Sequence, residues 1–107
     1  MSKLQKRKKL VPAYIIARIK VDDPALLKAY QAATPAIIEK YHGKFIVRGG
    51  SMSMLEGSDK SSQRIVVLEF PELSDAKAYY HSPEYSEARK LREGIGSFEV
   101  IAVDGFK

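Results

Sequence analysis

The segment Arg64 to Phe70 contains the run Ile65-Val66-Val67-Leu68, in which both sets of alternating positions are apolar. Because successive side chains of a β-strand point to opposite faces of a sheet, a strand made from this run is hydrophobic on both faces. Strands of that kind lie in the middle of a sheet, with cover on both faces. The sequence therefore predicts a sheet built around this segment.

An earlier segment is predicted to be a strand with one wholly apolar face. In residues 13–21 this face consists of Ala13, Ile15, Ala17, Ile19 and Val21. Such alternation is typical of a strand that packs one face on a core. Residues 44–48 and 98–103 are predicted to be two further strands. Gly49-Gly50 is predicted to be a bulge or a close approach of backbone, after which residues 51–55 continue the strand.

The first helix is predicted between the first two strands. Asp23-Pro24 is a capping acid followed by a proline suited to the first helical position, and apolar residues then recur every three or four positions as far as Tyr41. Pro35 lies inside this pattern, so a kink or a restart capped by Thr34 is expected. Gly43 is expected to end the helix in the left-handed conformation.

The second helical segment is predicted to break at its centre. Ser74 is expected to cap a helix that runs to Tyr80, and Ser82-Pro83 is expected to start another that ends at Glu93 before Gly94. The resulting order is β-α-β-β-α-β. It predicts an α+β fold, the ferredoxin-like plait, with an antiparallel four-stranded sheet and both helical segments on one face.

The uncovered face of such a sheet would be too apolar to remain in water, because the central strand is hydrophobic on both faces. We therefore expect a homodimer through the sheet faces.

The formal net charge of +5 comes from the first ten residues, which hold five basic residues and no acidic residue. Subtracting these five from the 18 basic residues leaves 13, which balance the 13 acidic residues. Residues 1–10 are predicted to be a disordered basic tail and residues 11–107 a single domain. Because the folded part has no net charge, nucleic acid is not an expected partner. No apolar run is long enough to span a membrane, so no membrane partner and a cytoplasmic location are expected.

The composition argues against metals and cofactors. The chain has no cysteine and only two histidines, so disulfides, thiolate chemistry and the usual metal sites are not expected. Neither the Walker A motif nor the dinucleotide-binding glycine motif is present, so nucleotide cofactors are not supported. No cofactor and no metal are predicted.

Several blocks of sequence resemble a known family. They are Ala13-Tyr14, residues 36–45, Val47-Arg48-Gly49-Gly50, Leu55-Glu56-Gly57, Leu68-Glu69-Phe70-Pro71 and residues 80–85. From Ala13 to about Gly105 the chain is similar to the bacterial family of domain of unknown function 1330, in the dimeric α/β-barrel superfamily. The resemblance implies a ferredoxin-like dimer. The wider superfamily looks like a mixture of small monooxygenases, lactone isomerases, haem enzymes and stress-related binding proteins, so it does not fix the reaction.

His81 is the candidate catalytic residue. Its ordinary pKa lies close to neutrality, which suits a general acid or base, and it lies at a predicted helix end among tyrosines. The alternative is that it caps the helix C-terminus. Tyr80 and Tyr85 are predicted to bind ligand, with packing in the core or the dimer interface as the alternative.

Arg48 is predicted to bind an anion together with the backbone of Gly49 and Gly50. The alternative is an ion pair with Glu69 or Glu56 across the sheet. Tyr14 completes the predicted ligand-binding set. The cations of the last helical segment, Arg89, Lys90 and Arg92, are interpreted as a solvated face.

Two hypotheses for function follow. The first is a cofactor-independent enzyme that acts on a small anionic or carbonyl-bearing metabolite, using Arg48 for the anion and His81 for proton transfer. The second is a non-catalytic module that binds a small ligand or serves a stress response. We also predict that Arg48 and His81 line one pocket and bind an anionic small molecule together.

Overall fold

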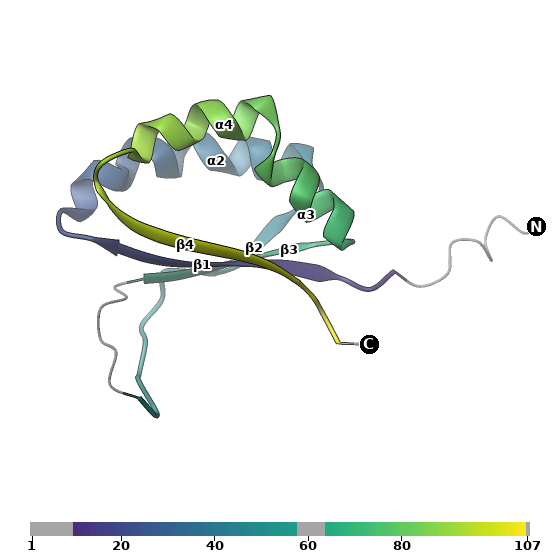
Figure 1. Cartoon of the computed structure of the whole chain (residues 1–107), viewed down its shortest axis with the longest axis horizontal. Coiled ribbons are helices and arrows are strands. Elements are labelled where there is room, and N and C mark those ends of the chain that lie inside the picture. The colour runs from purple at the N-terminus through teal and green to yellow at the C-terminus, as the bar shows by residue number, and fades with distance from the viewer. Residues whose placement is uncertain (1–9, 58–63, 107) are drawn as a thin grey trace, which may run out of the picture.

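The computed structural model describes residues 10–57 and 64–106, in which one antiparallel sheet carries helices on one face (Figure 1). The elements are β1 (Ala13–Val21), the 3₁₀-helix η1 (Pro24–Leu27), α2 (Lys28–Lys40), β2 (Lys44–Arg48), β3 (Arg64–Phe70), α3 (Leu73–Tyr80), α4 (Pro83–Arg89), the 3₁₀-helix η2 (Lys90–Arg92) and β4 (Gly96–Asp104). The strand order is β2-β3-β1-β4, so the predicted ferredoxin-like plait is confirmed. The predicted basic tail, apart from Leu10, lies outside the described residues.

The core lies between the sheet and the helices. The predicted apolar face of β1 turns inward, and β3 pairs with β2 on one edge and β1 on the other, as its doubly apolar run predicts. The main cluster of buried residues takes members from the sheet and from all three α-helices: Ile15, Ile38, Leu68, Phe70, Ala76, Tyr79, Tyr85 and Ala88. This cluster fixes the distance between the two layers.

Helix α2 continues through Pro35 without a restart, so the predicted cap at Thr34 is wrong. Thr34 is instead 4% exposed and packed inward. Proline has no N–H, which leaves the Gln31 carbonyl without its helical donor. The Arg48 guanidinium, from the end of β2, donates a 3.0 Å hydrogen bond to that carbonyl. A cation from the sheet therefore compensates the helix for its internal proline.

The left-handed residue that ends α2 is His42, with φ 73°, and not Gly43 as predicted. The His42 N–H donates to the Glu39 carbonyl and the Gly43 N–H donates to the Ile38 carbonyl. These two bonds form a Schellman motif in which His42 takes the position usually held by glycine. Gly43 is needed for another reason, because a Cβ there would lie 2.5 Å from the Phe70 ring.

Strand β2 ends at Arg48, and residues 51–55 are not a strand, which corrects the predicted continuation. Gly49 has φ 71° and turns the chain away, while its N–H still donates to the Ile65 carbonyl. The irregularity in the β2–β3 register lies between Phe45 and Val47 rather than at the glycines.

The second helical segment breaks where the sequence predicts. Ser82 caps α4, because its Oγ accepts a 3.0 Å hydrogen bond from the Tyr85 N–H and donates to the Tyr79 carbonyl. The cap position of α3 is Glu72, in extended backbone, so the predicted Ser74 cap is wrong. The last helix does not run to Glu93 as one α-helix but tightens into η2 after Arg89.

The face of the sheet opposite the helices is uncovered in the described part of the chain (Figure 1). Four apolar side chains form a row across it, one from each strand, in the order Val47, Val67, Ile16 and Ile101. Ile101 is 57% exposed and Val47 is 41% exposed. Among the described residues, no helix has the length and apolar character needed to span a membrane.

Candidate functional site

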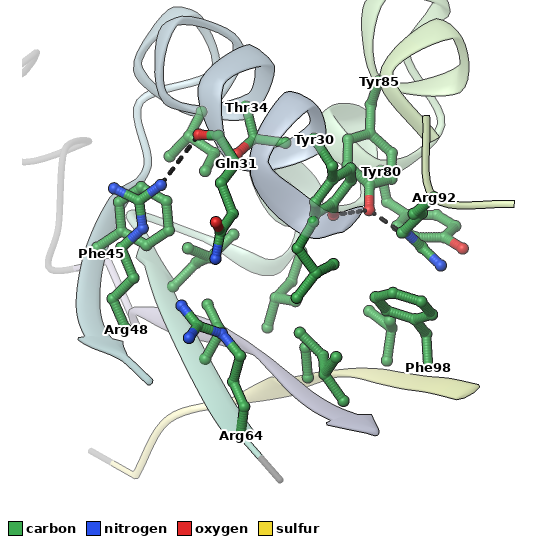
Figure 2. Close-up of a pocket in the computed structure, with 18 of the residues that line it drawn as sticks. Tyr30, Gln31, Thr34, Phe45, Arg48, Arg64, Tyr80, Tyr85, Arg92 and Phe98 are labelled. Carbon is green, nitrogen blue, oxygen red and sulfur yellow. Dashed lines mark hydrogen bonds between the residues drawn. The ribbon is translucent and has the colours of Figure 1, made fainter. Parts of the chain in front are cut away.

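A cavity lies between the inner face of the sheet and the helices (Figure 2). The centre of a water-sized molecule can occupy about 60 Å³ of it, which is several times the space that one water molecule needs. Apolar side chains of β1, β3 and β4 form its floor. The aromatic and polar residues that line it are Tyr30, Gln31, Thr34, Phe45, Arg48, Arg64, Tyr79, Tyr80, Tyr85, Arg92 and Phe98.

One end of the cavity is built around Arg92, which the sequence analysis wrongly placed on a solvated face. Its guanidinium carbon lies 4.0 Å from the centre of the Phe98 ring and 5.3 Å from that of Tyr30. One nitrogen of the guanidinium donates a 3.2 Å hydrogen bond to the Tyr85 hydroxyl. Its Nε is buried and has no hydrogen-bond partner among the described residues. Arg92 is therefore held by aromatic rings and one hydroxyl.

Two tyrosines that line the cavity, Tyr30 and Tyr79, hold their hydroxyl protons more tightly than usual. The hydroxyls of Tyr30 and Tyr85 lie 2.5 Å apart. Burial raises the pKa of Tyr30 above its ordinary value of 10.0, and the neighbouring Tyr85 raises it further. Burial also raises the pKa of Tyr79. Both groups are protonated at neutral pH.

The other end of the cavity carries Arg48 and Arg64 (Figure 2). Arg48 lies 4.2 Å from the centre of the Phe45 ring, in addition to its bond to the Gln31 carbonyl. Arg64 packs on the bare backbone of Gly49, since a Cβ there would lie 2.5 Å from the guanidinium carbon. Gly49 thus makes the room that Arg64 occupies.

The cavity is positively charged. Three arginines line it, and none of the described residues that line it is Asp, Glu, His or Lys. Among the described residues, no three His, Asp or Glu side chains cluster in a way that could hold a metal ion. Guanidinium groups with aromatic walls favour an organic anion over a cation.

Three of the predicted site residues line this cavity: Arg48, Tyr80 and Tyr85. His81 does not line the cavity that Arg48 lines. It is exposed at the end of α3, where its N–H donates to the Lys77 carbonyl and its ring meets Tyr80 edge-on at 5.4 Å between ring centres. That position matches the helix-capping alternative, and the catalytic role of His81 stays a prediction.

The other predicted ligand-binding residues lie outside the cavity wall. Tyr14 is on the opposite face of the sheet, where its hydroxyl donates a 3.0 Å hydrogen bond to Glu69. This bond raises the pKa of Tyr14. Gly49 contributes through its contact with Arg64, whereas a Cβ on Gly50 would have no neighbour within 4 Å among the described residues. The predicted glycine pair therefore consists of two residues with different surroundings.

The sequence analysis did not single out Tyr30, Arg64 or Phe98, and it misread Arg92. The sequence does indicate the position of Arg64, because Arg64 is two residues from Val66 on the same strand and therefore points to the same face, the one that faces the core. An arginine at an inward position is unusual unless it has a function or a partner. Arg92 had no such signal, since its position depends on how η2 packs against β4.

Comparisons with known proteins agree with this fold. The model of the family DUF1330, a domain of unknown function, matches residues 12–106. No curated protein matches the chain. A protein of unknown function from Rhodopseudomonas palustris superposes with a TM-score of 0.71 at 19% identity, covering 99% of this chain and 91% of its own.

Two further solved structures are similar at low sequence identity. SnoaB, a cofactor-independent oxygenase from Streptomyces nogalater, has a TM-score of 0.65 at 14% identity, covering 91% of this chain and 95% of its own. A dimeric protein of unknown function with a ferredoxin-like fold from Bacteroides fragilis has a TM-score of 0.57 at 19% identity, covering 87% of this chain and 95% of its own. At these identities the likeness concerns the fold alone.

Proposed function

This chain belongs to the DUF1330 family, and we propose that it binds a small organic anion with an aromatic or apolar body in the cavity between sheet and helices. The observation that carries the proposal is a wall of aromatic side chains with three arginines and, among its described residues, no acidic partner. The proposal replaces the predicted pairing of Arg48 with His81 by a site that lies wholly inside the cavity.

The chemistry of the wall explains the choice of ligand. A ring or alkyl group gains from contact with Tyr30, Tyr85 and Phe98, while its anionic group gains charge-assisted hydrogen bonds from a guanidinium. Protonated tyrosines add donors. Because none of the described residues in the wall is Asp, Glu, His or Lys, the site is better suited to holding a ligand than to moving its protons.

Calorimetric titration with phenylacetate tests the proposal. Wild-type protein should bind it, and Ala17→Leu should abolish binding, because Ala17 lines the cavity and a larger side chain would fill the space. Ala29→Leu, on the exposed side of α2, is the matched control and should bind as the wild type does. Equal binding by both variants would place the ligand elsewhere and refute the proposal.

A second candidate is a cofactor-independent enzyme that acts on a carbonyl-bearing metabolite in the same cavity. The three guanidinium groups favour it, since positive charge beside a bound carbonyl compound stabilises the enolate formed when a hydroxide ion from solvent takes an α-proton and becomes water. Such an enzyme should exchange the α-protons of phenylpyruvate for deuterium in D₂O faster than buffer does, which NMR measures directly. Exchange at the buffer rate would leave binding as the function.

We also propose that the chain forms a homodimer through the uncovered face of its sheet. The support is the apolar row Val47, Val67, Ile16 and Ile101, and the description of the Bacteroides fragilis neighbour as dimeric. Opposite charges flank the row, with Lys44 3.5 Å from Glu69 at one side. Burying this row in a second copy would remove exposed apolar surface from water.

A further inference from the structure

The cavity adjoins a second, more open hollow near the start of α2. By the same measure this hollow has a volume of about 390 Å³, and its wall includes Val21, Ala25, Leu27 and Lys28. Gln31 and Arg64 line both spaces. Figure 2 shows the side chains of Gln31 and Arg64 pointing toward one another at this place. A ligand with its body in the cavity can therefore reach solvent past Arg64.

The three arginines of the cavity are not equally free to bind an anion. Arg48 donates to the Gln31 carbonyl and stacks on Phe45. Arg92 donates to the Tyr85 hydroxyl and lies over the Phe98 ring. The guanidinium of Arg64 has no hydrogen-bond or ion-pair partner within residues 10–57 and 64–106, although the residue is half-buried. A half-buried guanidinium without a partner is the one that gains most from an arriving anion.

We infer that Arg64 is the anion receptor of this site and holds a carboxylate where the cavity meets the second hollow. The inference rests on the proposed function and names its ligand class, an arylalkanoate with the ring in the cavity and the carboxylate toward solvent. Lys28 in the wall of the hollow adds positive charge on the same side. Gln31 offers an amide donor beside Arg64.

Gly49 holds Arg64 in this position. Its φ of 71° and its missing side chain let the guanidinium pack directly on the backbone. The receptor is thus formed by the bare turn after β2 and the first residue of β3, two positions that the fold brings together.

The test compares two probes of equal size, phenylacetate and its uncharged analogue 2-phenylacetamide. Wild-type protein should bind the carboxylate about tenfold or more tightly than the amide, the order expected of one charge-assisted bond. Arg64→Gln should remove this preference by weakening carboxylate binding much more than amide binding. Arg48→Gln should keep most of the preference. Arg18→Gln, on the opposite face of the sheet, controls for the loss of one positive charge and should keep all of it.

The outcomes separate the two proposals. If neither probe binds wild-type protein, the proposed function itself is overturned. If both bind equally well, the cavity binds ligands but has no anion receptor, and the role of Arg64 is overturned alone. If the preference is lost with Arg48→Gln and kept with Arg64→Gln, the anion receptor is Arg48 and the role of Arg64 is overturned. Should Arg64→Gln fail to fold by circular dichroism, Gly49→Ala displaces the same guanidinium and should lower the preference, while Gly50→Ala should not.

Discussion

Glu84, in the first turn of α4, joins the second half of the chain to the end of α2. Its carboxylate accepts hydrogen bonds from Lys40 and, at 3.0 Å, from the Tyr41 hydroxyl. The bond from Lys40, with smaller contributions from the backbone N–H of Glu84 and from Tyr41, lowers the pKa of Glu84 from its ordinary value of 4.5 to about 2. The carboxylate thus stabilises the fold only while it is ionised.

This shift predicts a loss of stability in acid. Because the pKa is lower in the folded protein, the stabilisation is complete above about pH 4.5 and is lost as the pH falls toward about 2. Urea unfolding of wild type and Glu84→Gln at pH 7, 4 and 3 should give a difference that shrinks as the pH falls. Glu87→Gln, which removes an ion pair on the exposed side of α4, should show a much smaller trend. A difference between wild type and Glu84→Gln that stays constant with pH would contradict the assignment.

Replacement by alanine should affect the free energy of unfolding differently at Gly49 and at Gly50. Gly49→Ala should lower the free energy of unfolding by about 1–2 kcal/mol, because the residue is left-handed and its Cβ would meet the Arg64 guanidinium. Gly50→Ala should be neutral or slightly stabilising, since it lacks both constraints in the described part of the chain. Thermal unfolding of the two variants makes the comparison. Equal destabilisation would show that the pair acts as one hinge.

At the level of elements, Pro35 and Arg48 form a coupled pair across two layers. Arg48→Ala should lower the free energy of unfolding by about 1 kcal/mol or slightly more, because the Gln31 carbonyl loses its donor and Phe45 loses its cation. In a Pro35→Ala background the alanine N–H supplies the helical donor, so the same change at Arg48 should cost less. Chemical denaturation of the four proteins of this double-mutant cycle should give a coupling of about 0.5–1 kcal/mol. Additive effects would mean that the bond adds no stability.

The sequence predicted elements best where the signal is local. The alternation of residues 13–21 predicted β1 to the residue, and Ser82-Pro83 predicted the start of α4. The predictions of a left-handed Gly43 and of a strand over residues 51–55 were wrong, because both features depend on contacts between residues that are distant in the sequence. Gly43 is small because Phe70 packs on it, and the strand ends at Arg48 because Gly49 turns to seat Arg64.

The candidate site was predicted in part for the same reason. Arg48, Tyr80 and Tyr85 carried local signals, as residues beside a glycine pair or at a helix break, and they do line the cavity. His81 carried the same signal, yet α3 ends with its side chain exposed. Helical periodicity predicted that Arg92 faces solvent. The last turn is instead a 3₁₀-helix, in which the Arg92 side chain lies over the Phe98 ring, and the periodicity of the sequence does not predict this change.

At the scale of the whole molecule, the two faces of one strand have different tasks. Val66 lines the cavity and Val67 stands in the apolar row of the uncovered face. The doubly apolar run that predicts a central strand therefore serves a core on one side and, in our proposal, a second copy of the chain on the other. Neighbouring positions should respond differently to the same charge.

Val67→Asp should produce a folded monomer or an aggregating protein, because it places a carboxylate in the middle of the proposed interface. Val66→Asp should instead prevent folding, since an unpaired charge within the layer between sheet and helices costs several kcal/mol. Ser97→Asp, near the start of β4 and away from the row, is the matched control and should remain dimeric. Sedimentation velocity at high micromolar concentration, with circular dichroism to check folding, distinguishes these outcomes. A wild-type protein that sediments as a monomer would refute the proposed interface. The monomer would then leave the row of valine and isoleucine side chains in water, although exposing an apolar surface of this kind has a cost in free energy.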